Sequence, residues 1–349
     1  MSNFTQYIGC FHIHMPLKYY NVFIENIANE ASKSNLNFIF LSPHTPENKQ
    51  NEQDKQKYIK YFQKEGYYNK LMIFTGEEID ECSDKNHIVA YGPKEWVGKT
   101  SFENSIPIIN KSNGLMFIAH PFGKHRIFIS NSNHCWNKGL IKITGIEIWS
   151  LLFDLVQNRT LFTLPYNYLC FPHNLRGPNQ KTLELWDEYL KEKKTIGIAG
   201  LDIHKLLSPL SILDIKNSIN YKFVFKILRN HILCKEKLTG IFEKDKTIIL
   251  ESIKAGRLFF ANDFLMDSSE FFMGNIEENK TIGDIFNQNE EIILKLPYKS
   301  YIVIKSNGKT LWAGEAKKYK IPLKEKGFYR AEIFLYNKPW IFTNPVFVI

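Results

Sequence analysis

Short apolar runs alternate with amphipathic segments along the chain up to about residue 265, and several of the apolar runs end in His, Glu or Asp. The segments between them include stretches with apolar residues three and four apart, which is typical of helices packed on one face. This alternation favours a parallel α/β arrangement. We predict strands at 5–14, 38–44, 71–80, 87–92, 114–121, 145–150 and 195–204, and helices that include 20–35 and 182–192.

The pattern changes after about residue 265. Strand-like runs such as YIVIKSNGKTLWAGE and PWIFTNPVFVI then follow one another, and Asn307-Gly308 is a hairpin turn signal. We therefore predict two domains, an α/β domain at 1–265 and a small antiparallel β-sandwich at 266–349, joined through 255–263.

Polar residues at or near the ends of the predicted strands are candidate metal ligands. In parallel barrels the C-terminal ends of the strands meet at one mouth and carry the chemistry. The two imidazoles of the HIH sequence lie at alternate positions of a strand, so they point to the same face and can reach one ion. Imidazole and carboxylate together suit Zn²⁺, Mn²⁺ or Fe²⁺. The candidates are His12, His14, His44, Glu78, His87, His120, Asp202 and His204.

Each candidate also has a plainer interpretation. His12 and His14 could be polar residues of an edge strand, and Glu77 and Glu78 a solvated pair. Eight ligands exceed what one ion needs, and a carboxylate such as Glu78 can bridge two ions. Two bridged metals lower the pKa of a shared water and polarise an electrophile, as in two-metal hydrolysis.

Other polar residues receive weaker assignments. We expect Glu147 to support a ligand rather than to bind metal. Cys10 is expected to be a buried thiol, since no base is arranged to activate it. His134 and His231 are assigned no function.

Net charge and composition limit the classes of partner that we expect. The net charge is +9, but only six of the 45 basic residues are Arg, and no basic stripe with interleaved aromatics is visible. We therefore expect a small anionic substrate and no nucleic acid. Arg126 and Arg176 lie near His-containing loops and are candidate catalytic anion contacts, although solvated loops are an open alternative.

The location is inferred from what the sequence lacks. We see no secretory signal and no apolar run long enough to span a bilayer, and the five Cys are scattered without a CxxC motif. These features favour a cytoplasmic protein with reduced thiols and no membrane partner. They give no oligomeric state.

Five motifs in order resemble those of the PHP (polymerase and histidinol phosphatase) family of metal-dependent hydrolases. They are CFHIH, LSPH, TGEE with NHIVAYG, IAHP, and GLDIH, and the resemblance covers roughly residues 5–265. The tail resembles the C-terminal β-domain of the carbaryl-hydrolase-like (CehA/McbA) branch. The resemblance implies a distorted seven-stranded (β/α) barrel followed by that β-domain.

The resemblance also implies roles for the candidates. His12, His14, Glu78 and Asp202 would hold a first metal, and Glu78 would bridge to a second held with His87 and His120. His44 and His204 would belong to a third site.

Two departures weaken the third site. The family often has an acidic or His ligand where this chain has Tyr19, and an Asp where it has Pro43. Two His alone make a poor metal site. We therefore predict two tightly bound divalent ions (Mn, Zn or Fe) and a third site that is weak or empty. His44 and His204 would then bind substrate oxygen or shuttle protons.

Three functions follow from this set of residues. The first is a phosphoesterase in which a metal-bridging hydroxide attacks a small phosphorylated substrate and a His protonates the leaving group. The second is a carbamate, ester or amide hydrolase of the carbaryl-hydrolase type. The third is a binding module that keeps its metals without turnover.

Overall fold

The computed structural model describes residues 4–15, 20–44, 52–81, 86–127, 130–157, 163, 166, 169–203 and 221–349. Its helices are α1 (Tyr20–Lys33), α2 (Glu52–Phe62), α3 (Phe102–Lys111), α4 (Leu151–Val156), α6 (Gln180–Glu192), α7 (Tyr221–Val224) and α8 (Phe242–Lys254). Its strands up to residue 262 are β1 (Thr5–Ile13), β2 (Phe38–Leu41), β3 (Gly66–Tyr68), β4 (Leu71–Asp80), β5 (His87–Tyr91), β6 (Leu115–Ala119), β7 (Lys124–Ile127), β8 (Ser130–Asn133), β9 (Gly145–Ser150), β10 (Ile196–Ile203), β11 (Leu228–Cys234) and β12 (Leu258–Asn262). The later strands are β13 (Phe272–Asn275), β14 (Lys280–Thr281), β15 (Ile285–Phe286), β16 (Glu291–Ser306), β17 (Lys309–Pro322), β18 (Gly327–Leu335), β19 (Lys338–Thr343) and β20 (Val346–Val348).

Seven strands pair edge to edge in a closed ring, in the order β1, β2, β4, β5, β6, β9, β10 and back to β1. All of these pairs are parallel except those of β5, which is antiparallel to both β4 and β6. The predicted barrel is therefore confirmed, but the expectation of an all-parallel arrangement is wrong at β5. Only residues 81–86 join β4 to β5, and a parallel crossover needs a dozen or more residues.

Aromatic side chains fill the inside of this barrel. Phe11 of β1 stacks on Phe40 of β2 with ring centres 4.2 Å apart, and it meets Phe117 of β6 edge to face at 6.1 Å. Because β1 and β6 are not neighbours in the ring, the second contact crosses its interior. These rings are fully buried, so the barrel is a packed core whose interior is filled, as small barrels require.

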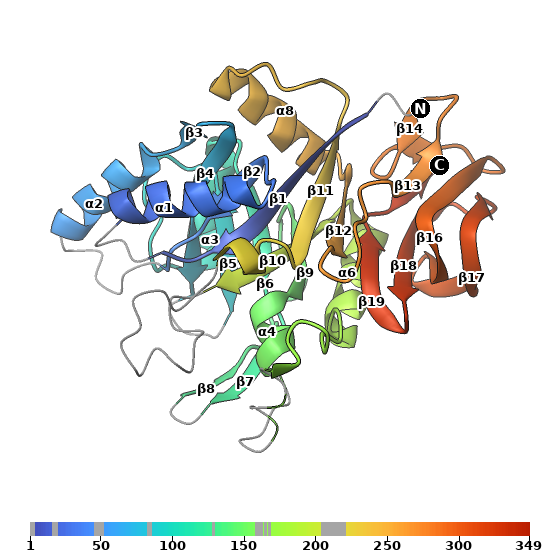
Figure 1. Ribbon diagram of the computed structural model, residues 1–349. Helices are drawn as coiled ribbons and strands as arrows, with labels where there is room; N and C mark the ends of the chain where they lie inside the picture. Colours follow the sequence, from blue (N-terminus) through green and yellow to red (C-terminus); the bar gives the residue numbers. More distant parts are fainter. Residues whose placement is uncertain are drawn as a thin grey trace.

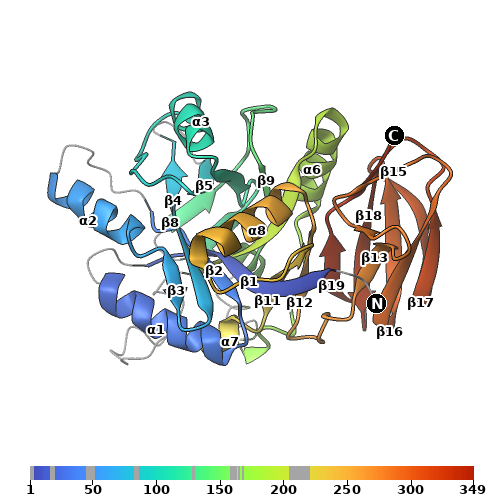
Figure 2. The same ribbon diagram turned by 90° about the horizontal axis from the view of Figure 1, so that it is seen from above.

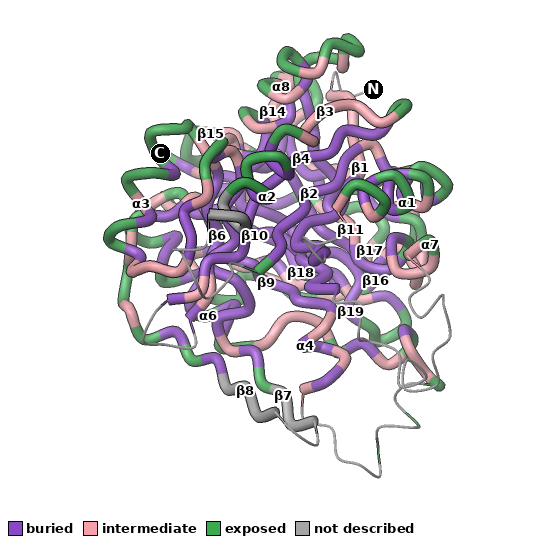
Figure 3. The backbone as a smooth tube through the Cα atoms, turned by 90° about the vertical axis from the view of Figure 1, so that its left-hand side faces the viewer, coloured by how far each residue is buried: buried purple, intermediate pink, exposed green. Residues whose placement is uncertain are grey.

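Helices cover the outside of the barrel. Figure 1 places α1, α2, α3 and α8 around the strands, and Figure 2 places α6 between the barrel and the C-terminal strands. Helix α1 buries Ile24, Ile27, Ala28 and Ala31, whose spacing of three and four residues forms one apolar face. In Figure 3 the barrel strands β2, β4 and β10 are mostly buried, whereas α1 and α8 carry exposed positions.

The C-terminal strands form a mainly antiparallel β-domain on one side of the barrel (Figures 1 and 2), in which only the short pair of β15 and β20 is parallel among the described strands. A second apolar core lies mostly within this domain. The predicted hairpin lies between β16 and β17, where Asn307 and Gly308 have φ of 51° and 82°. The predicted joining segment contains β12, which pairs antiparallel with β11 on one side and with β19 on the other. The predicted boundary at residue 265 stays a prediction.

Polar contacts fix α6 to the β-domain. Arg330 of β18 donates to both carboxylate oxygens of Asp187 in α6, at 2.7 and 2.8 Å, and a third nitrogen donates to Glu332 at 2.5 Å. The amide of Asn344 bonds both the N–H and the carbonyl of Gly197 in β10. The barrel and the β-domain are thus joined by buried hydrogen bonds as well as by β-pairing.

Within the described ranges, no helix is long and apolar enough to cross a membrane.

Candidate metal centre

The described residues include seven of the eight predicted ligands, and the structure brings these seven to one end of the barrel. His204, the eighth, lies outside the described residues, as does Tyr19. His87 begins its strand instead of ending it. Because β5 runs antiparallel, its first residue lies at the same end as the last residues of its neighbours, opposite Asp80 and Ala119.

The backbone at three of the site residues is in the left-handed region. The φ values are 59° at His12, 29° at His120 and 51° at Asp202, where residues other than glycine are uncommon. The register of β1 with both neighbours also shifts across His12, as at a β-bulge. Such local strain re-aims side chains and is typical of functional sites. It explains how His12 joins the site directly after Phe11, which faces the barrel interior.

Four donor atoms lie close together and form a first group, from His12, His14, Glu78 and Asp202. The Nε2 atom of His14 lies 3.1 Å from Nε2 of His12, 3.2 Å from Oε2 of Glu78 and 3.1 Å from Oδ1 of Asp202. His12 Nε2 lies 3.5 Å from the same Glu78 oxygen and 3.7 Å from the same Asp202 oxygen. A tetrahedral ion with ligands at about 2.0–2.1 Å separates its donor atoms by about 3.3–3.4 Å. These donors therefore fit one divalent ion.

Glu78 faces a second group with its other oxygen. Its Oε1 atom lies 2.8 Å from Nδ1 of His87 and 3.1 Å from Nε2 of His120. One carboxylate thus presents Oε2 to the first group and Oε1 to the second, which is the geometry of a bridging ligand. Glu78 is fully buried, so the predicted alternative of a solvated pair with Glu77 is wrong. Glu77 is buried too and accepts hydrogen bonds from the backbone of residues 97 and 98.

Glu147 supports the first group of donors through its contact with His12. Its Oε2 atom lies 2.6 Å from Nδ1 of His12, and both side chains are fully buried. A carboxylate on one imidazole nitrogen keeps the proton there and leaves the other nitrogen's lone pair for a metal. This contact is the supporting role that the sequence predicts for Glu147.

The buried carboxylates dominate the electrostatics. Burial disfavours the charged ring of His12, but Glu147, Asp202 and Glu78 outweigh it and raise its pKa well above the ordinary value. Burial likewise disfavours ionised Glu78, but the His44, His87 and His12 rings hold its pKa well below the ordinary value. Buried carboxylates that favour a positive charge on His12 also favour a divalent cation, which would take the place of the second proton on this ring.

His44 stands at the rim of the site. Its Nδ1 atom lies 3.1 Å from Oε2 of Glu78 and 3.7 Å from Oδ1 of Asp80, and its side chain is 43% exposed. Burial of the ring lowers its pKa, but these carboxylates outweigh that and raise it to about 9. Asp80, which also lies 3.5 Å from Nε2 of His87, is a carboxylate that the sequence analysis did not consider. Its position two residues after Glu78 puts it on the same strand face, and that alternation could have identified it.

A pocket of about 220 Å³ opens beside the site. His120 lines it, together with the apolar rings of Phe122, Trp149 and Phe153 and with Arg176 at the start of the segment leading into α6. The backbone N–H of Arg176 donates to Asp154, which fixes this turn. Arg176 thus lines the same pocket as His120, and its role as an anion contact stays a prediction. Arg126 belongs to β7, but its side chain lies outside the described residues.

Three histidine and cysteine assignments can be compared with the structure. Cys10 is fully buried, and burial raises its pKa to about 12, which agrees with an inert thiol. His231 is buried against Asp263 at 2.9 Å, away from the candidate ligands. His134, which the sequence left without a function, lies with His87 and His120, and one ring nitrogen of each is within 4.8 Å of the others. No local motif marks His134, since the β7–β8 hairpin separates it from His120.

No protein-family model matches the chain, and no curated protein matches it in sequence. Among solved structures, the chain is similar to a two-domain protein of Bacteroides vulgatus ATCC 8482 containing a predicted PHP-like metal-dependent phosphoesterase. The identity is 13%, the TM-score is 0.45, and the match covers 98% of this chain and 96% of that one. A likeness this distant carries nothing about activity, and the barrel described above rests on its own strand pairing.

Proposed function

We propose that this protein is a metal-dependent hydrolase with a PHP-like barrel, acting on a small phosphorylated substrate. The observation that carries the proposal is Glu78, whose Oε2 atom faces a group of imidazole and carboxylate donors and whose Oε1 atom faces the imidazoles of His87 and His120. When bound there, divalent ions supply Lewis acidity and a nucleophilic water at neutral pH. Zn²⁺, Mn²⁺ and Fe²⁺ all accept these donors.

The chain's own residues then bind and orient the substrate. Arg176, exposed and lining the pocket, pairs with non-bridging phosphate oxygens through charge-assisted hydrogen bonds. Phe122 and Phe153 line the same pocket and take up the apolar part of the leaving group. His44 stands between the donors and solvent, where it can pass a proton to the departing oxygen.

The test is a hydrolase panel on protein stripped of metal and reloaded with Zn²⁺, Mn²⁺ or Fe²⁺. We expect turnover of p-nitrophenyl phosphate, and its loss together with bound metal in Asp202→Asn. Arg176→Met should raise the KM for the phosphate about 10–100-fold, because a hydrogen bond to a charged group contributes about 1.5–3 kcal/mol. The matched control is Lys181→Met, which replaces an exposed Lys in the first turn of α6 and should leave KM unchanged.

A second candidate is hydrolysis of aryl carbamates, esters or amides. The aromatic wall of the pocket favours it, since Phe122, Trp149 and Phe153 suit an uncharged aryl group. Turnover of aryl carbamates or p-nitrophenyl esters without phosphatase activity would replace the first proposal by this one. Tight binding of metal with no turnover on any substrate would favour a binding module.

A further inference from the structure

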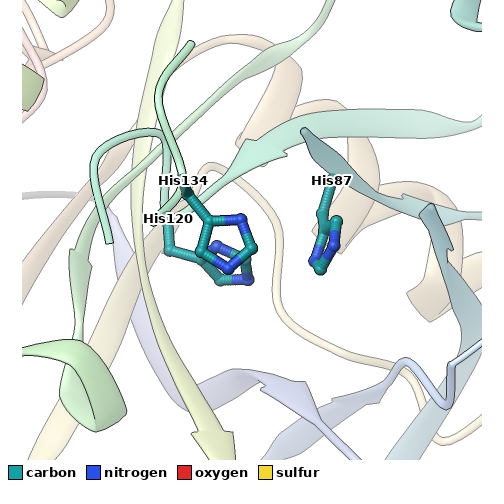
Figure 4. A group of neighbouring side chains, drawn as sticks. All are labelled: His87, His120 and His134. Atoms are coloured by element: carbon teal, nitrogen blue, oxygen red, sulfur yellow. The ribbon is translucent and has the colours of Figure 1, made fainter. Parts of the chain in front are cut away.

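We propose that His134 is a third imidazole ligand of the ion held by Glu78, His87 and His120. This inference rests on the proposed metal centre and adds a ligand to its second group. Figure 4 shows the rings of His120 and His134 close together, with the ring of His87 facing them. His134 is 6% exposed, so its ring is part of the interior of the site.

The spacing of the three rings matches a shared ion. An ion about 2.1 Å from each ring nitrogen lies about 3.2 Å from each ring centre, so rings at tetrahedral angles have centres about 5.2 Å apart. The observed distances between ring centres are 5.2 Å for His87 and His120, 4.7 Å for His87 and His134, and 4.6 Å for His120 and His134. The two shorter values correspond to angles of about 92–94° at the ion, roughly 15° below tetrahedral.

The backbone places His134 without help from the metal. Its N–H donates to the carbonyl of Gly123 at 2.8 Å, and the N–H of Gly123 donates to the carbonyl of His120 at 2.8 Å. The chain therefore leaves β6 at His120, makes the β7–β8 hairpin and returns to the same point. A Cβ at Gly123 would meet the ring of Phe153 at 2.7 Å, so this close return requires glycine.

Phe153 holds two of the rings in place. Its centre lies 4.6 Å from that of His120 and 5.4 Å from that of His134. Ligand rings fixed by packing and by backbone hydrogen bonds lose little freedom when an ion binds, so the site is preorganised.

The added imidazole changes which metal the second group prefers. Three imidazoles and one carboxylate form a nitrogen-rich set that suits Zn²⁺, whereas Mn²⁺ prefers carboxylate, carbonyl and water oxygens. We therefore expect the second site to retain Zn²⁺ against an excess of Mn²⁺.

The experiment compares full-length wild type with His134→Ala, His134→Gln and His173→Ala. His173 is exposed and rests against Phe264, so its removal is the matched control. Each protein is stripped of metal and titrated with Zn²⁺ against a chromophoric chelator. The Co²⁺ absorption spectrum then reports coordination number independently of activity.

We expect two sites in wild type and in His173→Ala. In both His134 variants one site should keep its affinity and the other should weaken by about 100-fold or more, because loss of even a supporting residue costs 10–100-fold. The Co²⁺ absorption should fall as water molecules enter the opened site and the coordination number rises. The shape-conserving His134→Gln keeps the test valid if His134→Ala does not fold.

Wild-type affinity and Co²⁺ spectrum in His134→Gln would overturn the inference and leave the proposed function standing. A wild-type protein that binds no divalent ion would instead refute the proposed function itself, and this inference with it.

Discussion

Replacing Arg330 with methionine tests how the β-domain holds helix α6. The Arg330 side chain is 2% exposed and forms three hydrogen bonds with Asp187 and Glu332. Methionine keeps much of the apolar stem but removes the charge, so two carboxylates are left buried without their cation. The guanidinium also lies over the Trp186 ring at 5.3 Å, and that contact is lost as well.

The expected cost is about 3–5 kcal/mol of unfolding free energy, because removing one partner of a buried pair leaves an uncompensated charge. At 1.4 kcal/mol for each factor of ten, this is a change of about 100-fold to 4,000-fold in the folding equilibrium. The matched control is Lys299→Met in the exposed pair with Glu315, whose side chains are 67% and 65% exposed. Its cost should stay under about 1 kcal/mol.

Urea unfolding followed by circular dichroism and Trp fluorescence measures both variants. A third variant, Arg330→Met with Asp187→Leu and Glu332→Leu, removes all three charges and should recover most of the loss, because apolar replacement of a buried ionic group is often neutral or better. Two results would refute the reasoning. One is an Arg330→Met protein within 1 kcal/mol of wild type, and the other is a triple variant no more stable than the single one.

Further predictions concern the supporting carboxylate, the thiols and acid. Glu147→Gln should weaken metal binding about 10–100-fold by releasing the ring of His12, and an unchanged affinity in a chelator competition would contradict this. In the native protein at pH 8, exposed Cys135 should react with a thiol reagent, whereas Cys10, whose pKa burial raises to about 12, should react only after unfolding. Burial raises the pKa of Asp263, but its imidazole and guanidinium neighbours outweigh this and hold it below 3.8. Its contribution to stability is therefore present above about pH 4 and lost as pH falls through the lower folded value, so Asp263→Asn should flatten the acid limb of the unfolding free energy below about pH 4.

The sequence allows most of the barrel and of the first donor group to be predicted. Core packing alone does not account for a polar residue at the end of an apolar run. His12, Glu78 and Asp202 therefore stand out at their strand ends. The short link at 81–86 carries the information that β5 is antiparallel, although the alternation pattern alone conceals it.

Residues that reach the site through long-range packing cannot be predicted from the local sequence pattern. His134 reaches the site because a hairpin returns its backbone to Gly123, and neither the hairpin's length nor its register follows from local pattern. Asp80 differs, because the period of the strand already places it on the same face as Glu78, so the local pattern is enough to predict it.

The position of β1 has a consequence for how the chain is made. Its parallel partner β10 begins at residue 196, and its antiparallel partner β11 begins at residue 228. During synthesis, one edge of the first strand therefore waits for its partners until most of the chain has left the ribosome. At about 5–20 residues per second this is a delay of roughly 10–40 s, in which an apolar strand edge is open to other chains. Closure of the barrel is thus a late event in biosynthesis, and the nascent protein should depend on chaperones until it occurs.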